Sequence, residues 1–332
     1  MEYWQIASGS LGRYYAKDFI RFGMAFVGGA EQASRMAEVK VGDRILLKRG
    51  TSKVVAAGEV VERDGKHRGN NDKGWLRDFD GWDLRAYCFV NWHKPDKPRG
   101  TTGLTRYTIQ NVAKRHLKDL AEEIISSVPV EQNLDLEPRD TRSVPDTEII
   151  EYLINQGLRP RAAEDLTATF NRISLLARYY YRHRWEDVRE HETRTFLVIP
   201  LLLALGWAEQ QIKIELPVKG HQRADVACFS KPFATAKEDP VLIVETKGFS
   251  QGLNYAPAQA ERYAAQFPNC RVVVVSNGYC YKTWIRQDDG PLSERPTAYL
   301  NLLKPQDSYP LDPDNVQGCL EVLRVLLPFS WA

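Results

Sequence analysis

The apolar residues in the first part of the chain form short runs of the kind found in strands. Three runs are compact, and a fourth alternates apolar and polar residues with a period of two, which predicts strands. These runs lie at 3–7, 44–48, 53–62 and 82–92. Glycines separate them, as in the turns of a small barrel, and helices are expected at 15–22 and 111–126. We therefore predict a β-rich domain over residues 1–128.

The pattern changes after this domain. Residues 129–146 lie in a polar, acidic stretch with several prolines, which predicts a linker. A helical connector is expected at 147–185. A long helix and then alternating strands and helices follow, which predicts an α/β domain at 186–332. The chain is thus expected to be a two-domain α+β protein.

A hairpin is the most specific local prediction in this second domain. The segment 272–284 contains two apolar runs separated by Asn277 and Gly278. This dipeptide favours a type I′ turn, in which both central residues have positive φ.

One apolar strand ends in two charges. The run at 241–244 is followed by Glu245 and Lys247, which alternation places on the same face of the strand. Asp225 lies at the start of the preceding strand, so that two adjacent strands could bring the three residues together at one end of a sheet. An ordinary ion pair at a strand end is the alternative, because an unpaired buried charge is costly.

The chemistry of this trio suits phosphodiester hydrolysis. Hard divalent cations such as Mg²⁺ prefer carboxylate oxygens. A bound cation of this kind activates water and offsets charge on a phosphate, while a neighbouring lysine can orient that water. The residues therefore predict a Mg²⁺ site, in which Mn²⁺ could substitute.

The spacing D-x(19)-E-x-K resembles the PD-(D/E)xK nuclease superfamily. Two neighbouring stretches, "HETRTFLVIPLLLALGW" and "APAQAERYAAQF", resemble the nuclease domain of type I restriction R subunits. The resemblance implies an α/β PD-(D/E)xK restriction-endonuclease-like core. In it, Asp225, Glu245 and Glu192 hold the metal, Lys247 positions the attacking water, and Gln259 orients the lysine or a phosphate. Those R subunits continue into an ATP-driven motor, but the chain has no GxxxxGK[ST] loop, so no use of ATP is expected.

The first domain carries a second resemblance. Its segments "VGDRILLK" and "AAGEVVE" are similar to the PUA-like superfamily in its EVE and YTH branches. That resemblance implies a PUA-like β-barrel that holds a flipped, modified base in an aromatic pocket.

The candidate pocket residues come from loops and strand ends. Trp75 and Phe79 lie in a polar loop without a core-facing rhythm, and ordinary anchoring of the loop is the alternative for both. By resemblance, a second wall lies near Met24 or Phe26, and a polar contact lies near Ser8.

Composition narrows the class of protein. The chain has 332 residues, a net charge of +2 and five cysteines without a CxxC pair, which indicates a reducing cytoplasm and no disulfide framework. No apolar run is long enough to span a membrane, and no signal peptide is expected.

These observations lead to one leading hypothesis. The protein is expected to be a type IV-like, Mg²⁺-dependent endonuclease that recognises double-stranded DNA carrying a modified base and restricts phage. The central helices could support a homodimer. A binding or regulatory protein with a vestigial nuclease fold, and an RNA-directed nuclease, are the alternatives.

Overall fold

The chain divides into two compact units, Met1–Asp140 and Thr141–Ala332. The computed structural model describes residues 1–9, 12–131, 137–218, 220, 222–232, 239–253, 258, 262–263, 265–286 and 290–328. The boundary between the units falls within the segment 129–146, and the helices of 147–185 belong to the second unit.

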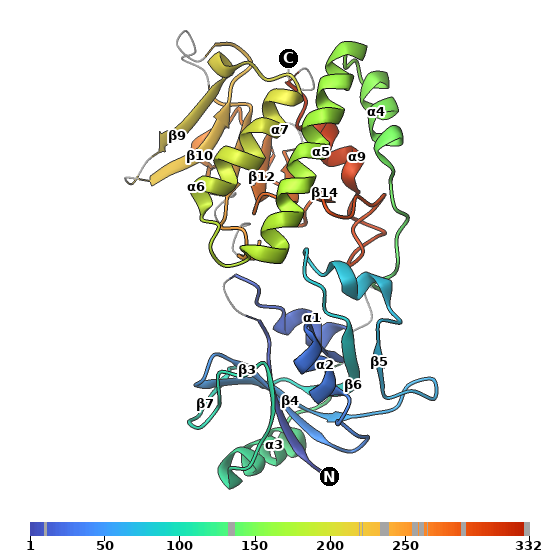
Figure 1. Ribbon diagram of the computed structural model, residues 1–332. Coiled ribbons are helices and arrows are strands. Elements are labelled where there is room, and N and C mark those ends of the chain that lie inside the picture. The colour runs from blue at the N-terminus through green and yellow to red at the C-terminus, as the bar shows by residue number, and fades with distance from the viewer. Residues whose placement is uncertain are drawn as a thin grey trace. The chain divides into compact units, whose positions relative to one another are not determined.

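The first unit is built on an eight-stranded sheet that curls into a half-barrel (Figure 1). The strands along the sheet are β2 (Met24–Val27), β6 (Ala86–His93), β4 (Lys53–Val60), β3 (Arg44–Arg49), β1 (Tyr3–Ala7) and β8 (Ile109–Asn111), with β5 (Arg68–Asn70) beside β6 and β7 (Arg99–Gly100) beside β4. β1 pairs with β3 in parallel and with β8 antiparallel. The four strands expected from the apolar runs are confirmed as β1, β3, β4 and β6.

In the described part of this unit, three α-helices and one 3₁₀ turn accompany the sheet. They are α1 (Ala16–Arg21), α2 (Ala30–Met36), η1 (Gly74–Asp78) and α3 (Arg115–Ser127). Leu117, Ala121 and Ile124 repeat at helical spacing on α3 and pack on apolar residues of β3 and β4. The helix expected from residue 111 begins later, because Asn111 pairs with Trp4 as the last residue of β8.

The second unit contains a six-stranded sheet. Its strands, in spatial order, are β14 (Ala298–Asn301), β13 (Cys280–Ile285), β12 (Val272–Ser276), β11 (Leu242–Thr246), β10 (Gln222–Cys228) and β9 (Ile212–Val218). β11 and β12 are parallel and the other neighbours are antiparallel. All five residues of β11 are buried, which fits a continuous apolar run in the middle of a sheet.

The described helices of this unit pack on one another and on the sheet. They are α4 (Asp146–Asn155), α5 (Pro160–His183), α6 (Glu190–Thr193), the π-helical turn η2 (Arg194–Val198), α7 (Ile199–Ala204), the 3₁₀ turn η3 (Glu209–Gln211) and α9 (Cys319–Val325). α5 packs against α7 and both cross one face of the sheet, while α9 packs against β14 (Figure 1). The long helix expected at about 186–205 is therefore present as the run α6–η2–α7, with a π turn in its middle.

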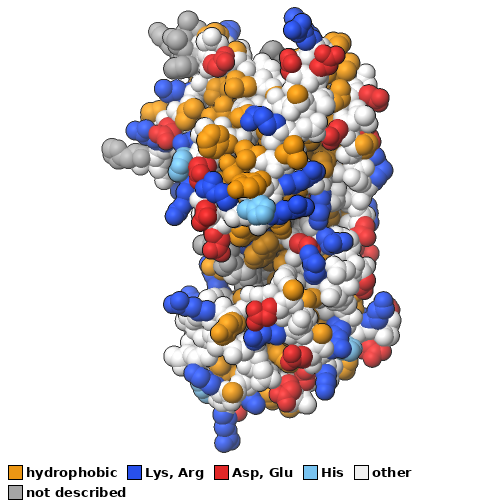
Figure 2. Space-filling model, viewed as in Figure 1, with side chains coloured by type: hydrophobic (Ala, Val, Ile, Leu, Met, Phe, Trp, Pro, Cys, Tyr) orange, Lys and Arg blue, Asp and Glu red, His pale blue; other side chains and the backbone are white. Residues whose placement is uncertain are grey.

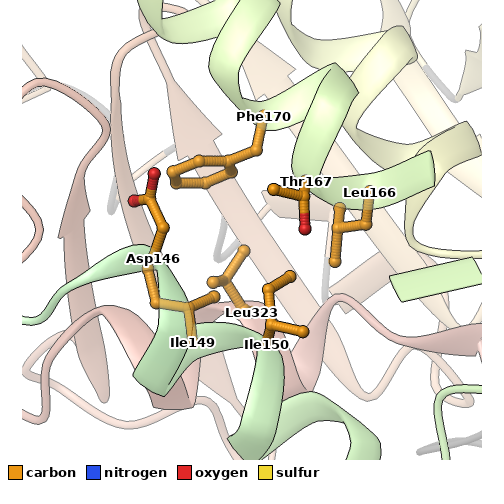
Figure 3. Close-up of a pocket in the computed structure, with 7 residues that line it drawn as sticks. All are labelled: Asp146, Ile149, Ile150, Leu166, Thr167, Phe170 and Leu323. Carbon is orange, nitrogen blue, oxygen red and sulfur yellow. The ribbon is translucent and has the colours of Figure 1, made fainter. Parts of the chain in front are cut away.

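A small apolar crevice lies between α4, α5 and α9. Its lining consists of Asp146, Ile149, Ile150, Leu166, Thr167, Phe170 and Leu323 (Figure 3). The space inside is about 10 Å³, roughly the room for one water molecule. The crevice is therefore a packing seam between helices and contributes nothing to a substrate site.

The hairpin between β12 and β13 is confirmed, but its turn is not type I′. Gly278 has φ of 92°, whereas Asn277 is absent from the residues with positive φ. The Asn277 side chain instead accepts a hydrogen bond from the Cys280 N–H (3.0 Å), and the Gly278 N–H donates to Ser276 Oγ (2.9 Å). Side-chain hydrogen bonds therefore shape this turn, so that only the glycine needs the left-handed conformation.

Candidate active site

Two buried carboxylates meet where β10 lies beside β11. The strands pair antiparallel with Val226 opposite Val244, so the next residues, Asp225 and Glu245, lie side by side. Asp225 is 8% exposed and Glu245 is 3% exposed. The structure thus brings together the two carboxylates that the sequence placed on adjacent strands.

Thr246 and Arg194 donate hydrogen bonds to Asp225. One carboxylate oxygen, Oδ2, accepts from the N–H (2.6 Å) and from Oγ1 (2.8 Å) of Thr246. The other oxygen, Oδ1, lies 3.2 Å from Nη1 of Arg194. The carboxylate is therefore fixed by β11 on one side and by a cation from η2 on the other.

Glu245 is held by a lysine and a tyrosine. Lys247 Nζ lies 2.7 Å from Oε1, and the Tyr263 hydroxyl donates to Oε2 over 3.0 Å. Burial raises the pKa of the Glu245 carboxyl, and the charge of Asp225 adds to this effect, while both hydrogen bonds lower it. The direct contact between Glu245 and Lys247 is the ion pair that the sequence left as the alternative, and here it forms inside the carboxylate cluster.

Glu190 is a third acidic residue of the cluster. It shares a hydrogen bond with Asp225. Burial is the main cause that raises the pKa of the Glu190 carboxyl, and Asp225 raises it further, whereas Lys247 and Arg194 lower it. Because Glu190 and Arg194 are four residues apart in one helical run, both face Asp225.

Glu192 lies elsewhere. Its Oε2 accepts from the N–H of Arg189 (2.9 Å), at the start of α6, and its Oε1 lies 3.3 Å from Arg184. The structure therefore does not bring Glu192 to Asp225, because a side chain two positions from Glu190 points to another side of the helix. Gln259 lies outside the described residues.

The loop after β11 is tied to its surroundings at both ends. The N–H of Lys247 donates to the carbonyl of Ser276 (2.8 Å), and the N–H of Phe249 donates to the carbonyl of Val188 just before α6 (3.1 Å). Further along, Asn277 Nδ2 donates to the carbonyl of Gln251 (3.0 Å). The loop that carries Lys247 is thus fixed to the hairpin and to the start of the helix that carries Glu190.

The donor chemistry of this cluster fits a hard divalent cation, although the residues are not arranged as a finished metal shell. Among the described residues, no three His, Cys, Asp or Glu side chains converge closely enough to hold a metal ion. Glu190, Asp225 and Glu245 nevertheless supply carboxylate oxygens of the kind that Mg²⁺ prefers. Their crowding, which raises the pKa of Glu190 and Glu245, would be relieved by a cation.

The residues proposed for a base pocket in the first unit are all buried. Phe26, Trp75 and Phe79 are 1%, 5% and 0% exposed, and Ser8 is 1% exposed. The ring centroids of Phe26 and Phe79 are 4.7 Å apart, and those of Trp75 and Phe79 are 6.3 Å apart. The rings therefore pack on one another and leave no gap in which a base could stack.

Ser8 and Met24 have structural partners as well. Ser8 Oγ donates to the carbonyl of Lys48 (3.1 Å), and the Met24 carbonyl accepts from the indole N–H of Trp92 (3.2 Å). Ser8, Met24 and the three rings are thus placed as core residues in this structure.

Several residues around both clusters were not anticipated from the sequence. In the second unit these are Glu190, Arg194 and Thr246. The i, i+4 spacing of Glu190 and Arg194 was a readable signal for two of them. In the first unit, Arg13 is 1% exposed, lies over the Trp82 ring at 4.9 Å and donates to the Asp80 carbonyl at 3.0 Å. No sequence pattern marked that arginine as buried.

Part of the second unit is similar to a known protein family. Residues 189–294 match the family described as type I restriction enzyme R protein N terminus. This range contains Glu190, Arg194, Asp225, Glu245 and Lys247, so the unit carries a restriction-nuclease-like domain.

The chain was also compared with curated proteins and with solved structures. No curated protein matches the chain. Among solved structures, the NMR structure of Rpa0253 from Rhodopseudomonas palustris is similar at 14% identity, over 38% of this chain and 95% of its own, with a TM-score of 0.25. Within the described residues, no helix is both long and apolar enough to cross a membrane.

Proposed function

We propose that the second unit is a metal-dependent endonuclease that hydrolyses phosphodiester bonds. The observation that carries the proposal is the cluster of the buried Asp225 and Glu245 with Lys247 and Glu190, inside the range that matches the restriction-enzyme family. Buried carboxylates with raised pKa values in one cluster are typical of functional sites.

Each residue has a role that follows from its place. Asp225 and Glu245 would hold the cation, with Glu190 as the third carboxylate in place of Glu192, for which the family resemblance implies that role. When bound, Mg²⁺ or Mn²⁺ supplies Lewis-acid chemistry that activates water and offsets charge on the phosphate. Lys247, 2.7 Å from Glu245, is placed to orient a water beside the same carboxylate.

Single substitutions test this assignment. Asp225→Asn, Glu245→Gln and Lys247→Ala should each reduce cleavage of DNA in Mg²⁺ by about a hundredfold to a thousandfold, because each removes a group of the reacting centre. Binding to the same DNA, measured by anisotropy in Ca²⁺, should persist. Glu192→Gln is the matched control and should cleave close to the wild-type rate. A Glu245→Gln protein that cleaves DNA at the wild-type rate would refute the proposal.

The finer part of the proposal concerns the target. We propose that the first unit selects double-stranded DNA that carries a modified base, with restriction of phage as the role. The support is the sequence resemblance to PUA-like domains. Since Phe26 and Phe79 touch, a base could enter there only if the segment with Trp75 and Phe79 moves away.

A substrate panel separates the possible targets. Phage genomes with cytosine, methylcytosine, hydroxymethylcytosine, glucosylated hydroxymethylcytosine or methyladenine would be incubated with the protein in Mg²⁺ or Mn²⁺, beside an RNA of matched length. Cutting of one modified genome alone is the expected result. Equal cutting of every genome would remove the reader role, cutting of RNA alone would favour an RNA-directed nuclease, and no cutting would favour a vestigial nuclease fold.

A homodimer is also part of the proposal, because one centre cuts one strand at a time. Apolar side chains gather on the face of the second unit that carries α5 and α7, among Lys and Arg (Figure 2). Leu175 and Tyr179 on α5 and Phe196 on η2 are 64%, 53% and 46% exposed. Sedimentation of the full chain with and without DNA would show whether two copies associate.

A further inference from the structure

Arg194 is a cation inside the cluster to which the proposed chemistry gives no role. Its Nη1 lies 3.2 Å from Asp225 Oδ1, and its Nη2 lies 3.2 Å from Glu215 Oε1. The arginine side chain is 13% exposed. One guanidinium thus bridges a buried carboxylate of β10 and a half-exposed carboxylate of β9.

The position of Arg194 bears directly on metal coordination by Asp225. Thr246 holds Asp225 Oδ2 through its backbone N–H and its hydroxyl. Oδ1 is therefore the oxygen with which Asp225 would meet a divalent cation, and Arg194 contacts that atom. Two cations at one carboxylate oxygen repel each other, so coordination through Oδ1 requires Arg194 to move away.

Glu215 is the second carboxylate partner of Arg194. It has φ of 54°, and the pairing of β9 with β10 passes over it, from Leu216 opposite Ala224 to Ile214 opposite Val226. The register is the same on both sides of this step, so no residue is inserted, and the pairing is interrupted at Glu215 and at Asp225, the residue opposite it. Glu215 also binds Arg223 (2.9 Å). Arg194 can therefore release Asp225 and keep its contact with Glu215.

We propose that Arg194 is a displaceable positioning residue, which holds Asp225 in place and yields Oδ1 to an incoming divalent cation while it stays bound to Glu215. This inference rests on the proposed metal-dependent function. It implies that Arg194 opposes cation binding and that Glu215 favours it. A monovalent ion, with half the charge, would displace the arginine poorly.

Calorimetric titration of the full chain with Ca²⁺ tests the inference without any cleavage. Arg194→Met should bind Ca²⁺ about tenfold more tightly than wild type, because the competing charge is gone. Glu215→Gln should bind it about tenfold more weakly, because the arginine loses its other partner. Arg194→Lys keeps the charge and should stay near wild type. Glu192→Gln, which removes a carboxylate from the same helix, is the control for a simple change of net charge.

The opposite signs of the two main effects separate this role from a merely structural one. If Arg194 only supports the fold, both Arg194→Met and Glu215→Gln weaken Ca²⁺ binding, and the inference is overturned. If Arg194→Met does not melt cooperatively, the test depends on Glu215→Gln. A Ca²⁺ affinity of Glu215→Gln equal to that of wild type would contradict the inference. If wild type binds neither Ca²⁺ nor Mg²⁺, the proposed function fails together with this inference. If wild type binds metal and cleaves DNA but Arg194→Met does not bind Ca²⁺ more tightly, this inference alone is refuted.

Discussion

The turn at Gly278 connects the hairpin to the helical run that carries the candidate active site. A Cβ added at Gly278 would lie 2.5 Å from Leu197 Cδ1 and 2.7 Å from Thr193 Cγ2, both closer than real Cβ contacts. Thr193 and Leu197 are fully buried, so neither can move out of the way into solvent. The change Gly278→Ala therefore forces the hairpin and the helix apart.

The expected cost has two parts. A non-glycine residue at the φ of 92° of Gly278 costs about 1–2 kcal/mol. Overpacking against the helix adds about 1–3 kcal/mol, which gives a total of roughly 2–5 kcal/mol. Gly220 is the matched control, because it has φ of 81° in the same unit and nothing within 4 Å of the added Cβ. Gly220→Ala should cost only the first part, and the gain from a stiffer unfolded chain is the same in both variants.

Hydrogen exchange measured at rising urea concentrations reads the unfolding free energy of the second unit by itself, from peptides that cover β11, β12 and β13. Gly278→Ala should lower this free energy by about 1–3 kcal/mol more than Gly220→Ala does. Leu197→Ala should cost less in the Gly278→Ala background than in the wild-type background, because the methyl group added at the turn takes up part of the space. An equal loss of unfolding free energy in Gly278→Ala and Gly220→Ala would show that the added methyl group at Gly278 does not press on the helix, and the reasoning would be wrong.

Three further substitutions probe the carboxylate cluster. Thr246→Val removes one of the hydrogen bonds to Asp225 and should lower the unfolding free energy by about 1.5–3 kcal/mol in urea titration, so a loss below about 0.5 kcal/mol would contradict it. Tyr263→Phe removes a hydrogen bond that lowers the pKa of Glu245, so the acidic limb of the pH–cleavage profile should move to higher pH, and an unmoved limb would count against the role. Because the pKa of Glu190 is raised in the folded protein, its contribution to stability is complete below the ordinary Glu pKa of about 4.3 and is lost as pH rises through the raised pKa. Glu190→Gln should therefore flatten the fall of unfolding free energy above that pH, and curves that stay parallel to wild type would refute the linkage.

Much of the second unit could be predicted from local pattern. The run at 241–244 is continuous and apolar, and the structure buries it as β11 in the middle of a sheet. Alternation and strand adjacency were then enough to bring Asp225 and Glu245 together. These predictions hold because strand periodicity and antiparallel pairing leave few other arrangements.

The aromatic residues of the first unit show where local pattern fails. Trp75 and Phe79 lie in a polar stretch without strand or helix periodicity, which left a base pocket and ordinary anchoring of the loop as the two interpretations. The structure buries both rings against Phe22 and Phe26, which come from a much earlier segment of the chain. Such contacts depend on how the loop folds over α1 and β2, and no spacing within the loop encodes them.

Glu190 and Glu192 are less than one helical turn apart, yet only Glu190 faces Asp225. Both acids lie at the start of the predicted helix, and side chains two positions apart point about 200° apart around its axis. Whichever acid faces Asp225, the residue four positions later faces it too. Four positions after Glu192 comes Phe196, which is 46% exposed, whereas four positions after Glu190 comes Arg194, which pairs with Asp225. The helical face that carries an acid together with a complementary base was therefore the better choice for a carboxylate cluster, and the sequence already contained that distinction.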